Sequence, residues 1–388
     1  CFFTEDELRE GDDGVKYTPL GTEVEWVEEE SYFFKLSSYT DKLLEYYKAN
    51  PTFIQPETRR NEIMAFVAQE GGLKDLSISR HKKRLEWGIP VPDDEDHVMY
   101  VWLDALTNYI TALGYPDLEA EKYTKYWPAN FHVIGKDITR FHTIYWPAFL
   151  MAADIELPQT IFAHGFINVN GAKMSKSVGN VLSPDDLVQT YGLDALRYLL
   201  MREVPHGQDG NFSHEHAVQR INADLANGLG NLAQRTLSMI YKNCDAALPA
   251  PNELNADDNK LLDQVYNVVR VARENFDAFK IHRSAEEIWK VVSAADIYVD
   301  AQAPWKLKKE DPERMKTVLY VLAETVRCLA ILAQPFTPDA AAKLLDQLKV
   351  DESYRNFAAL NAEHKLQHGT SIDKPEGVFP RIHIEEVA

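Results

Sequence analysis

Three short apolar segments separated by helical stretches constrain the fold more than any other feature of this sequence. The segments are residues 97–102, 131–135 and 160–165, and residues 104–113 and 138–153 between them have the spacing of amphipathic helices. Strand, helix, strand at this spacing is typical of a parallel sheet with right-handed crossover connections. The sequence therefore predicts three buried parallel strands in an α/β domain.

Polar residues stand where each predicted strand ends. Asp104 follows the first strand, Lys136 and Asp137 follow the second, and His164 and Gly165 close the third. Ligands of parallel sheets bind beyond the carboxyl ends of the strands, where a carboxylate can accept both hydroxyls of a ribose. Asp137 is therefore a candidate for that role, in addition to capping the helix that follows it. His164 and Gly165 would bring backbone close to an adenine, although a tight turn at the strand end explains Gly165 about as well.

A lysine-rich stretch follows the third predicted strand. Residues 171–180 read Gly-Ala-Lys-Met-Ser-Lys-Ser-Val-Gly-Asn, and Ser183 and Pro184 then open a helix with a capping-box variant. Lys173 and Lys176 supply charge, and hydroxyls and backbone amides supply hydrogen-bond donors, so such a loop can close over a polyanion. Two lysines near serines are common on solvated loops. Five specific residues in order between a strand and a capped helix favour the binding interpretation.

Helical periodicity dominates the second half of the chain. Apolar residues recur at three- and four-residue steps from about residue 214 to residue 350, with proline-containing breaks at 249–251 and 335–338. This pattern predicts an antiparallel helix bundle. Residues 31–69 also have helical spacing, interrupted by two prolines, and are interpreted as a packed core face.

Charge and cysteine content exclude several classes of protein. The 388 residues carry a formal net charge of −19, which argues against a nucleic-acid coat or a protein of anionic membranes, although a local basic face can still bind RNA. The cysteines Cys1, Cys244 and Cys328 form no Cys-x-x-Cys pair, so we expect no zinc site and a reducing compartment. No apolar run is long enough to span a bilayer, and we expect no signal peptide.

Further motifs follow one another along nearly the whole chain. They are Asp75-Leu-Ser-Ile-Ser-Arg80, Tyr100-Val-Trp-Leu-Asp-Ala105, His132-Val-Ile-Gly-Lys-Asp-Ile138, Phe141-His142 with Trp146-Pro-Ala148, Asn231-Leu-Ala-Gln-Arg235 and Ala303-Pro304-Trp305. Together with the Lys-Met-Ser-Lys-Ser run that begins at Lys173, they resemble the methionyl-tRNA synthetase family of class I aminoacyl-tRNA synthetases. The lysine run marks the class, whereas the segments around Trp102, Trp146 and Trp305 mark the methionine enzymes.

The sequence departs from this family in several places. The family's His-x-Gly-His motif and the first half of its nucleotide-binding domain are not found here, and Leu106 follows Ala105 where some relatives carry proline. The chain begins at Cys1 within acidic, turn-rich sequence, so we expect further residues upstream. For the same reason we expect residues 1–388 alone not to activate an amino acid at a useful rate.

The resemblance implies an α/β protein. It would contain the second half of a Rossmann-type parallel sheet, followed by an all-α antiparallel anticodon-binding helix bundle. The expected segments are residues 1–74, the largely helical end of a connective insertion; 75–165, the second half of the catalytic domain; 166–213, the lysine-loop and stem-contact region; 214–350, the anticodon-binding domain; and 351–388, a C-terminal tail.

The implied reaction is the ATP-dependent joining of methionine to tRNA, with Mg²⁺ bridging the phosphates of ATP. Lys173 and Lys176 would be the catalytic residues, because they would stabilise the charge that develops on the phosphates. The ATP-binding residues implied by the resemblance are Arg80, Asp137, His164, Gly165, Lys173, Met174, Ser175 and Lys176. For Arg80, a surface ion pair is the alternative interpretation.

The family's methionine pocket maps onto an aromatic-rich part of this chain. The matching residues are Trp102, Ala105, Tyr109, Ile138 and His142. Aromatic walls suit a thioether, since sulfur–aromatic contacts are favourable by about 0.3–1.5 kcal/mol, and Tyr109 or His142 could donate a hydrogen bond to the sulfur. Without the family, an aromatic-rich helix such as residues 141–146 is more typical of a core than of a pocket.

The family's anticodon contacts map onto the predicted bundle. Asn231 and Arg235 are four residues apart and share a helix face, where Asn can bind a base edge and Arg a base or phosphate. Trp305, which follows Pro304, could stack on an unstacked anticodon base, or instead plug the end of a helix. The implied partner is tRNA(Met), including the initiator, read at its CAU anticodon.

Two other functions remain open at this point. One is a class I synthetase for another apolar amino acid such as leucine, isoleucine or valine, and the other is a non-catalytic tRNA-binding module. We expect a monomer with no membrane partner, in the cytoplasm or an organellar matrix.

Overall fold

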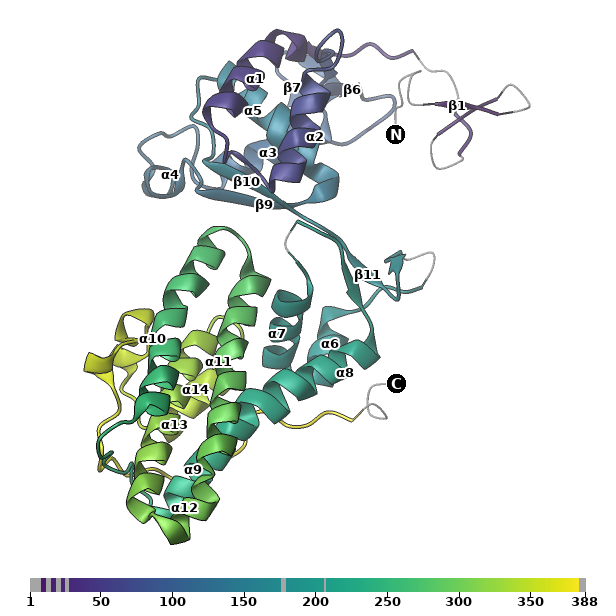
Figure 1. Ribbon diagram of the computed structural model, residues 1–388. Helices are drawn as coiled ribbons and strands as arrows, with labels where there is room; N and C mark the ends of the chain where they lie inside the picture. The colour runs from purple at the N-terminus through teal and green to yellow at the C-terminus, as the bar shows by residue number, and fades with distance from the viewer. Residues whose placement is uncertain are drawn as a thin grey trace. The chain divides into compact units, whose positions relative to one another are not determined.

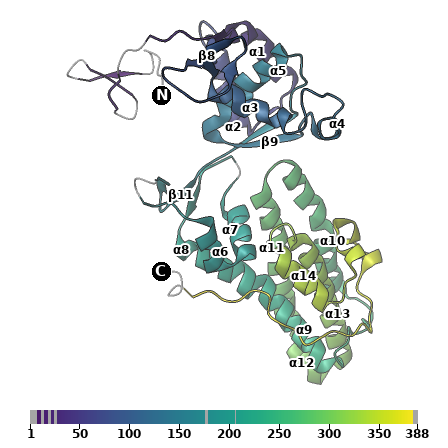
Figure 2. The same cartoon turned by 180° about the vertical axis from the view of Figure 1, so that it is seen from behind.

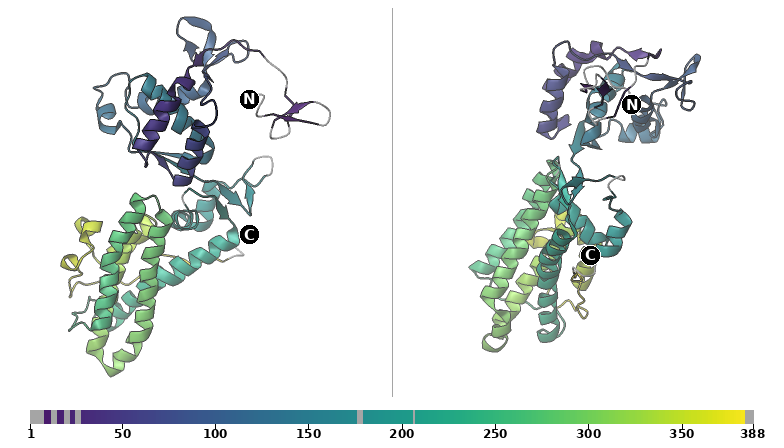
Figure 3. Two further views of the ribbon diagram at one scale, coloured as in Figure 1. Left: turned by 45° about the horizontal axis from the view of Figure 1, so that its top comes forward. Right: turned by 90° about the vertical axis from the view of Figure 1, so that its right-hand side faces the viewer.

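The computed structural model of the chain divides into two units, Cys1–Ala163 and His164–Ala388, and each is described by itself. The structure describes residues 8–11, 15–18, 22–24, 28–175, 179–205 and 207–383. Figures 1 and 2 display the elements from opposite sides, and Figure 3 adds two further views. Within these ranges, the structure contains no helix with the length and apolar character needed to cross a membrane.

A three-stranded sheet organises the first unit. Its order is β4 (Ile54–Gln55), β10 (Thr160–His164), β9 (Phe131–Gly135), and β10 runs parallel to β4. Strands β9 and β10 confirm two of the three predicted strands. Residues of β9 alternate between exposed and buried, so one face of this strand meets the core.

Helices pack against the buried face of this sheet. They are α1 (Thr40–Ala49), α2 (Glu57–Val67), α3 (Val101–Thr111) and α5 (Trp146–Ala152), and Figure 1 shows them gathered on one side of β9 and β10. The core joins Leu43 of α1 and Ile63 of α2 to Ile134 of β9 and Ile161 of β10. Sequence from residues 36–73 therefore shares one core with the strands that carry the candidate nucleotide residues.

The prediction of a parallel strand at residues 97–102 is wrong. Strand β8 (Asp94–Met99) instead pairs antiparallel with β6 (Ser79–His81) and β7 (Pro90–Val91), in a sheet of its own. Antiparallel strands can be joined by a tight local turn, whereas a parallel pair needs a long crossover. Only two residues separate β7 from β8, so the local hairpin forms. Val101 and Trp102 begin helix α3, which places Asp104 in its first turn rather than after a parallel strand.

The third strand of the central sheet comes from a region that was predicted to be helical. Residues 31–69 form two helices, as expected, but β4 lies between them at Ile54–Gln55. Pro51 follows the end of α1, and Pro56 disfavours helical backbone at Gln55 before it and stands at the N-cap of α2. A two-residue strand carries too little periodicity to be found in the sequence.

Short elements complete the first unit. They are β1 (Arg9–Glu10) paired antiparallel with β2 (Lys16–Tyr17), β3 (Phe33–Phe34) paired antiparallel with β5 (Leu76–Ser77), and the helix α4 (Glu121–Tyr126).

The second unit begins with a small sheet. Its order is β12 (Ala172–Lys173), β11 (Ile167–Val169), β13 (Gly210–Phe212), with β11 antiparallel to β12 and parallel to β13. The lysine stretch therefore starts as the second arm of a β-hairpin, which we call the lysine hairpin (residues 167–173). The helices α6 (Pro184–Tyr191) and α7 (Leu193–Glu203) follow it.

The predicted cap of the helix after the lysine stretch is confirmed. The Ser183 side chain accepts a hydrogen bond from Asp186 N, and Pro184 is the first residue of α6. Gly192 lies between α6 and α7 with a φ of +79°, a conformation that glycine adopts without a steric penalty.

The rest of the second unit is largely helical, as predicted. Its helices are α8 (His214–Ile221), a π-helical segment (Asn222–Gly230), α9 (Asn231–Asn243), α10 (Ala256–Asp277), α11 (Ile281–Gln302), α12 (Pro304–Glu310), α13 (Pro312–Ala333) and α14 (Pro338–Gln347). The two predicted breaks fall between α9 and α10 and between α13 and α14. A further break occurs before α12, where Ala303 adopts a left-handed conformation with φ of +44°.

Helix α13 forms the centre of the helical core. Every residue from Thr317 to Ala333 is buried. Among residues 351–383 the structure contains only short turns and a single β-bridge, yet Leu360, Leu366 and Ile382 are buried against the same core. This tail is therefore packed onto the helices.

Candidate functional site

Four aromatic side chains from two elements meet in the first unit. Trp102 and Tyr109 lie seven residues apart on α3 and share one face, and Phe141 and His142 lie in a π-helical turn (Phe141–Tyr145) ahead of α5. Trp102 stacks on Phe141 with ring centroids 3.8 Å apart and an interplanar angle of 14°. We call these four residues, together with His132 of β9, the aromatic cluster. Short π-helical segments occur frequently at functional sites.

A hydrogen-bond chain fixes the protons within the aromatic cluster. His142 Nδ1 lies 3.0 Å from Ile138 O, so Nδ1 donates and Nε2 is left to accept from Tyr109 Oη at 2.8 Å. Burial lowers the pKa of His142, only partly offset by the Ile138 carbonyl, and this keeps the imidazole neutral. Burial also raises the pKa of Tyr109. Both protons are thus engaged within the protein, and neither is a spare donor for a sulfur atom.

His132 is a member of the cluster that the sequence did not single out. Its ring meets the Tyr109 ring nearly edge-on, with centroids 4.2 Å apart, and its Nε2 is buried without a hydrogen-bond partner. Burial and the neighbouring His142 lower the pKa of His132 to about 4, so it is neutral at pH 7. Trp146 Nε1 is buried without a partner as well. His132 could have been found from the alternation of exposed and buried residues along β9, in which it is the first buried position.

The other predicted methionine residues lie at the borders of this cluster. Ile138 is half-buried and supplies the carbonyl that accepts from His142. Ala105 is exposed on α3, within the turns that carry Trp102 and Tyr109. The structure therefore brings together Trp102, Tyr109, Ile138 and His142, with Ala105 on the same helix as the first two.

The predicted ATP-binding residues of the first unit occupy two places. Asp137 is exposed in a short 3₁₀ turn directly after β9, which is the position beyond a strand end that the sequence predicted. Arg80 lies on β6, where its Nη1 donates to Ser77 Oγ at 2.9 Å and to Ser79 O at 2.7 Å. Its guanidinium also lies 4.4 Å above the Tyr100 ring.

An asparagine closes the lysine stretch in the second unit. Asn180 Nδ2 donates to Lys173 O at 3.2 Å, and Asn180 Oδ1 accepts from Ser175 N at 2.9 Å. The exposed Lys173 side chain lies over the Phe166 ring at 4.4 Å, and Met174 and Ser175 are half-buried. Lys176 lies outside the described residues. No role was predicted for Asn180, because an asparagine at a loop end is ordinary turn chemistry.

Gly165 has a structural reason to be glycine. A Cβ at this position would collide with the backbone of Gln208, and it would stand 2.7 Å from Asp209 N. His164 is exposed, and its Nδ1 lies 2.9 Å from Gly165 O. Close backbone approach therefore accounts for the glycine, and His164 remains accessible beside it.

Three of the four predicted anticodon residues meet where α9 lies beside the start of α12. Asn231 is the first residue of α9 and Arg235 lies one turn further, with its guanidinium 5.6 Å from the Trp305 ring. Pro304 is buried as the first residue of α12, whereas Trp305 is 44% exposed. An exposed tryptophan ring is not the helix-end core plug that was the alternative interpretation. The structure brings Arg235, Pro304 and Trp305 to one place.

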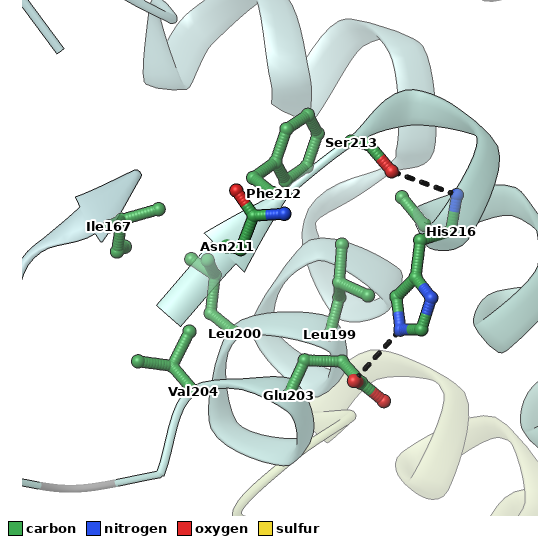
Figure 4. A pocket seen from close by; sticks show the side chains of 10 residues that line it. Ile167, Leu199, Leu200, Glu203, Val204, Asn211, Phe212, Ser213 and His216 are labelled. Carbon is green, nitrogen blue, oxygen red and sulfur yellow. Dashed lines mark hydrogen bonds and ion pairs between the residues drawn. The ribbon is translucent and has the colours of Figure 1, made fainter. Parts of the chain in front are cut away.

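A small cavity lies where the lysine hairpin meets α7 (Figure 4). Ile167 of β11, Leu199 and Leu200 of α7 and Phe212 of β13 line it, and its volume of about 20 Å³ is comparable to the space of a single water. At its edge, His216 Nε2 lies 2.9 Å from Glu203 Oε2. This cavity is too small for a substrate.

No cluster of three His, Cys, Asp or Glu side chains suited to a metal ion is found within the described ranges. The free cysteines among these residues are Cys244 and Cys328.

Comparison with known proteins gives two family matches along the chain. Residues 16–237 match the family of tRNA synthetases class I (M), and residues 248–388 match the anticodon binding domain of methionyl tRNA ligase.

Individual relatives match over nearly the whole chain. A methionine–tRNA ligase of Mesorhizobium japonicum is 57% identical over 381 residues, which are 98% of this chain and 73% of the relative. A methionine–tRNA ligase of Mycobacterium leprae is 50% identical over 392 residues, covering 100% of this chain and 72% of the relative. Among solved structures, Mycobacterium tuberculosis methionyl-tRNA synthetase in complex with methionyl-adenylate matches with a TM-score of 0.92 and 52% identity, over 98% of this chain and 74% of that one.

Proposed function

The chain belongs to the methionyl-tRNA synthetase family of class I aminoacyl-tRNA synthetases, and we propose how its residues carry out methionine–tRNA ligation. In the first step, a carboxylate oxygen of methionine attacks the α-phosphorus of ATP, giving methionyl-adenylate and pyrophosphate. In the second, a hydroxyl of the terminal tRNA ribose attacks the activated carbonyl, giving methionyl-tRNA and AMP. Because the carboxylate is already a nucleophile, the protein's part in the first step is positioning and charge stabilisation.

In this proposal Lys173 and Lys176 stabilise the charge that develops on the phosphates. Lys173 stands exposed at the end of β12, and Asn180 holds the backbone on both sides of Met174. Mg²⁺ would enter with ATP, since it prefers phosphate oxygens and water to a cage of protein ligands. Asp137 would accept the ribose hydroxyls. Arg80, His164, Gly165, Met174 and Ser175 would complete the nucleotide site, on a Rossmann-type sheet of which this chain supplies the second half.

The main support for assigning the methionine pocket to the aromatic cluster is the hydrogen bond between Tyr109 and His142. Since His142 Nδ1 donates to Ile138 O and Nε2 accepts from Tyr109, the polar atoms of His142 and Tyr109 are already satisfied. Such a wall suits a thioether, which accepts hydrogen bonds only weakly, and Trp102 adds an aromatic surface for the sulfur. Ala105 leaves room for an unbranched side chain. A pocket of this kind rejects a changed shape by about 1–3 kcal/mol per methylene.

We propose that the helices after residue 214 form an anticodon-binding bundle. Asn231 and Arg235 would contact base edges or phosphates of the CAU anticodon, and Trp305, held by Pro304, would stack on a base. The half-exposed ring of Trp305 supports this role, because an exposed aromatic face is what stacking requires. The partners are then elongator and initiator tRNA(Met). We further propose a monomer that works in the cytoplasm or an organellar matrix.

Amino-acid-dependent ATP–pyrophosphate exchange tests the proposed chemistry. Residues 1–388 contain no His-x-Gly-His motif, so we expect little exchange from them alone; the assay uses an active enzyme that contains these residues. Methionine should support exchange, and leucine, isoleucine and valine should not. Exchange with one of those three instead would identify a different class I synthetase. No exchange with any amino acid, but retained tRNA binding, would favour the tRNA-binding module.

The same assay tests the lysine role. Lys173→Ala should lower the single-turnover rate of adenylate formation by about a hundredfold or more, which is the usual loss when one charge-stabilising donor is removed. Methionine affinity should change by less than about twofold, because the lysine acts on the phosphates. Lys343→Ala, an exposed lysine on α14, is the matched control. An unchanged rate in Lys173→Ala would contradict the assignment.

A further inference from the structure

Helix α7 is tied to the distant end of the helical region. Asp194 Oδ2 accepts a hydrogen bond from Ala340 N at 2.7 Å, so a side chain of α7 caps the start of α14. Arg197 Nη2 donates to Pro335 O at 2.8 Å, in the turn between α13 and α14. These two contacts span more than a hundred residues of sequence. Helix α7 is thereby held to the last turns of the helical core.

A buried hydrogen bond connects α7 to the π-helical segment as well. Tyr198 is fully buried, and its Oη donates to Asp224 Oδ2 at 2.6 Å. Asp224 O accepts from Trp289 Nε1 at 2.9 Å, and the ring of Trp289 lies 4.4 Å from that of Tyr198. Arg220 Nη1 lies 3.4 Å from the same carboxylate oxygen. The position of Asp224 therefore fixes α7 and α11 together.

The π-helical segment connects the Tyr198–Asp224 hydrogen bond to Asn231. It runs from Asn222 to Gly230, and Asn231 is the next residue, so α8, the segment and α9 follow one another without a loop (Figure 1). Gly228 inside it has φ of −86° and ψ of −107°, which is not helical. A Cβ on Gly230 would stand 2.8 Å from Leu225 O. A helix interrupted in this way can change register in discrete steps, which is one way in which a movement passes from one end of a helix to the other.

The other side of α7 contacts the lysine hairpin. Leu199 and Leu200, next to Tyr198, line the same small cavity as Ile167 of β11 (Figure 4). The chain that leaves α7 forms β13, and Asn211 Oδ1 of that strand accepts from Gly171 N at 2.7 Å. The hairpin is therefore held by the end of α7 and by the strand that follows it.

We propose that Tyr198 and Asp224 are positioning residues through which RNA bound at Asn231, Arg235 and Trp305 constrains α7 and the lysine hairpin. The inference rests on the proposed anticodon role of those three residues. Tyr198 and Asp224 themselves contact neither RNA nor ATP. The coupling passes along the π-helical segment to Asp224, across one hydrogen bond to Tyr198, and through Leu199 and Leu200 to β11.

Hydrogen exchange of residues 1–388 tests this proposal without requiring catalysis. A CAU anticodon stem-loop RNA is added at saturating concentration, and backbone exchange is followed in α7, the π-helical segment and residues 231–235. In the wild-type chain, the RNA should slow exchange in α7 by about fivefold or more, the lower range of usual coupling between sites. In Tyr198→Phe, protection should remain at residues 231–235 and be lost in α7.

Two variants keep the outcome interpretable. Tyr320→Phe removes another buried hydroxyl from the same core, one that donates to Leu366 O at 2.7 Å, and it should retain the protection of α7. Asp224→Ala removes the oxygen that accepts from Tyr198 Oη, and it should behave as Tyr198→Phe does.

The possible results separate this inference from the function on which it rests. Equal protection of α7 in wild type and Tyr198→Phe overturns the inference, and so does RNA binding that leaves α7 of the wild-type chain unprotected. Both results leave the anticodon role intact. A stem-loop that does not bind the wild-type chain overturns the anticodon role, and the inference with it.

Discussion

Two clusters of buried polar residues, one in each unit, differ in how many of their polar atoms have a hydrogen-bond partner. On α13, Glu324 and Arg327 are almost fully buried and joined by two hydrogen bonds of 2.6 and 2.9 Å. Tyr266 and Leu366 N donate to the same carboxylate, and Arg327 Nη1 donates to Ala359 O. We call this set the ionic knot. In the aromatic cluster, by contrast, His132 Nε2 has no partner, and neither has the neighbouring Trp146 Nε1.

The difference separates a structural role from the binding role that we propose for the aromatic cluster. A buried charge is tolerated only when it is paired and hydrogen-bonded, and the ionic knot meets that requirement while tying the C-terminal tail to α13. Buried polar atoms without partners destabilise a fold, so they persist mainly where something other than stability is selected. In the aromatic cluster, buried polar atoms without partners lie beside neutral rings that hold one another in place.

The largest effect is expected when one charge of the ionic knot is removed. Arg327→Met should destabilise the helical unit by about 3–5 kcal/mol, because it leaves the carboxylate of Glu324 buried and uncompensated. Unfolding in urea is monitored by hydrogen exchange of the α13 amides, so the measured loss of unfolding free energy refers to this unit alone.

Two further variants decide whether the cost comes from the unpaired charge. Glu324→Leu combined with Arg327→Met removes both charges and should cost less than Arg327→Met alone. Arg270→Met removes the exposed Arg270–Glu274 pair of α10, and its effect should stay below about 0.5 kcal/mol. A double variant as unstable as the single one would show that packing, not charge, dominates the knot.

The second prediction concerns an aromatic side chain that is exposed rather than buried. Trp305→Ala should weaken binding of the CAU stem-loop by about 1–3 kcal/mol, the usual worth of one base stacked on an aromatic ring. ATP–pyrophosphate exchange by an active enzyme containing these residues should be unchanged. Trp87→Ala, which truncates a tryptophan that is 75% exposed in the other unit, is the matched control for RNA binding. Equal losses of exchange and of RNA binding in Trp305→Ala would indicate a folding defect.

A smaller effect is expected inside the aromatic cluster. Tyr109→Phe keeps the ring against His132 but removes the proton that His142 Nε2 accepts. The KM for methionine should rise by an amount that corresponds to about 0.5–1.5 kcal/mol, the net worth of one neutral hydrogen bond. Tyr123→Phe removes a hydroxyl from the surrounding apolar cluster and serves as the control. A methionine KM that does not change would remove Tyr109 from the specificity determinants.

How far the sequence predicts this molecule depends on the range over which each signal acts. The helical half, the Ser183 cap and strands β9 and β10 were predictable, since their signals are periodic or local. Residues 97–102 were assigned to the wrong sheet, because apolar residues such as Val98 do not reveal whether their partner strand is local or distant. The two-residue strand β4 had no periodicity to read.

The candidate site follows the same rule. The family resemblance located Trp102, Tyr109 and His142, which the structure brings together. It did not indicate the direction of their hydrogen bonds, which depends on Ile138 O and on burial. His132 was missed because its role arises from a tertiary contact with Tyr109, which has no sequence signature. The contacts of Asn180 with Lys173 and Ser175 are local, but an asparagine at a loop end is ordinary turn chemistry and does not stand out.

The smallest predicted effect concerns a satisfied histidine, which contrasts with the unsatisfied His132 in the same unit. His97 is buried on β8, and both its nitrogens face oxygen atoms: Asp94 Oδ2 at 2.8 Å and Glu30 O at 3.3 Å. Burial alone would lower the pKa of His97, but the hydrogen bond and charge of Asp94, with the contribution of Glu30, raise it above its usual range. Tyr32 Oη also donates to Asp94 Oδ2, and the His81 ring lies 4.9 Å from that of His97.

The sign of the pH dependence follows from the raised pKa of His97. Protonated His97 stabilises the fold fully below the unfolded value of about 6.5, and this contribution is lost as pH rises through the higher folded pKa. Hydrogen exchange of the β8 amides, corrected for the intrinsic pH effect, should report a local stability that decreases above pH 6.5. In His97→Gln this decrease should be absent, because the variant has no group that titrates at this position. A decrease of the same size in His97→Gln would assign the pH dependence to another group, and the contrast between the two histidines would then rest on geometry alone.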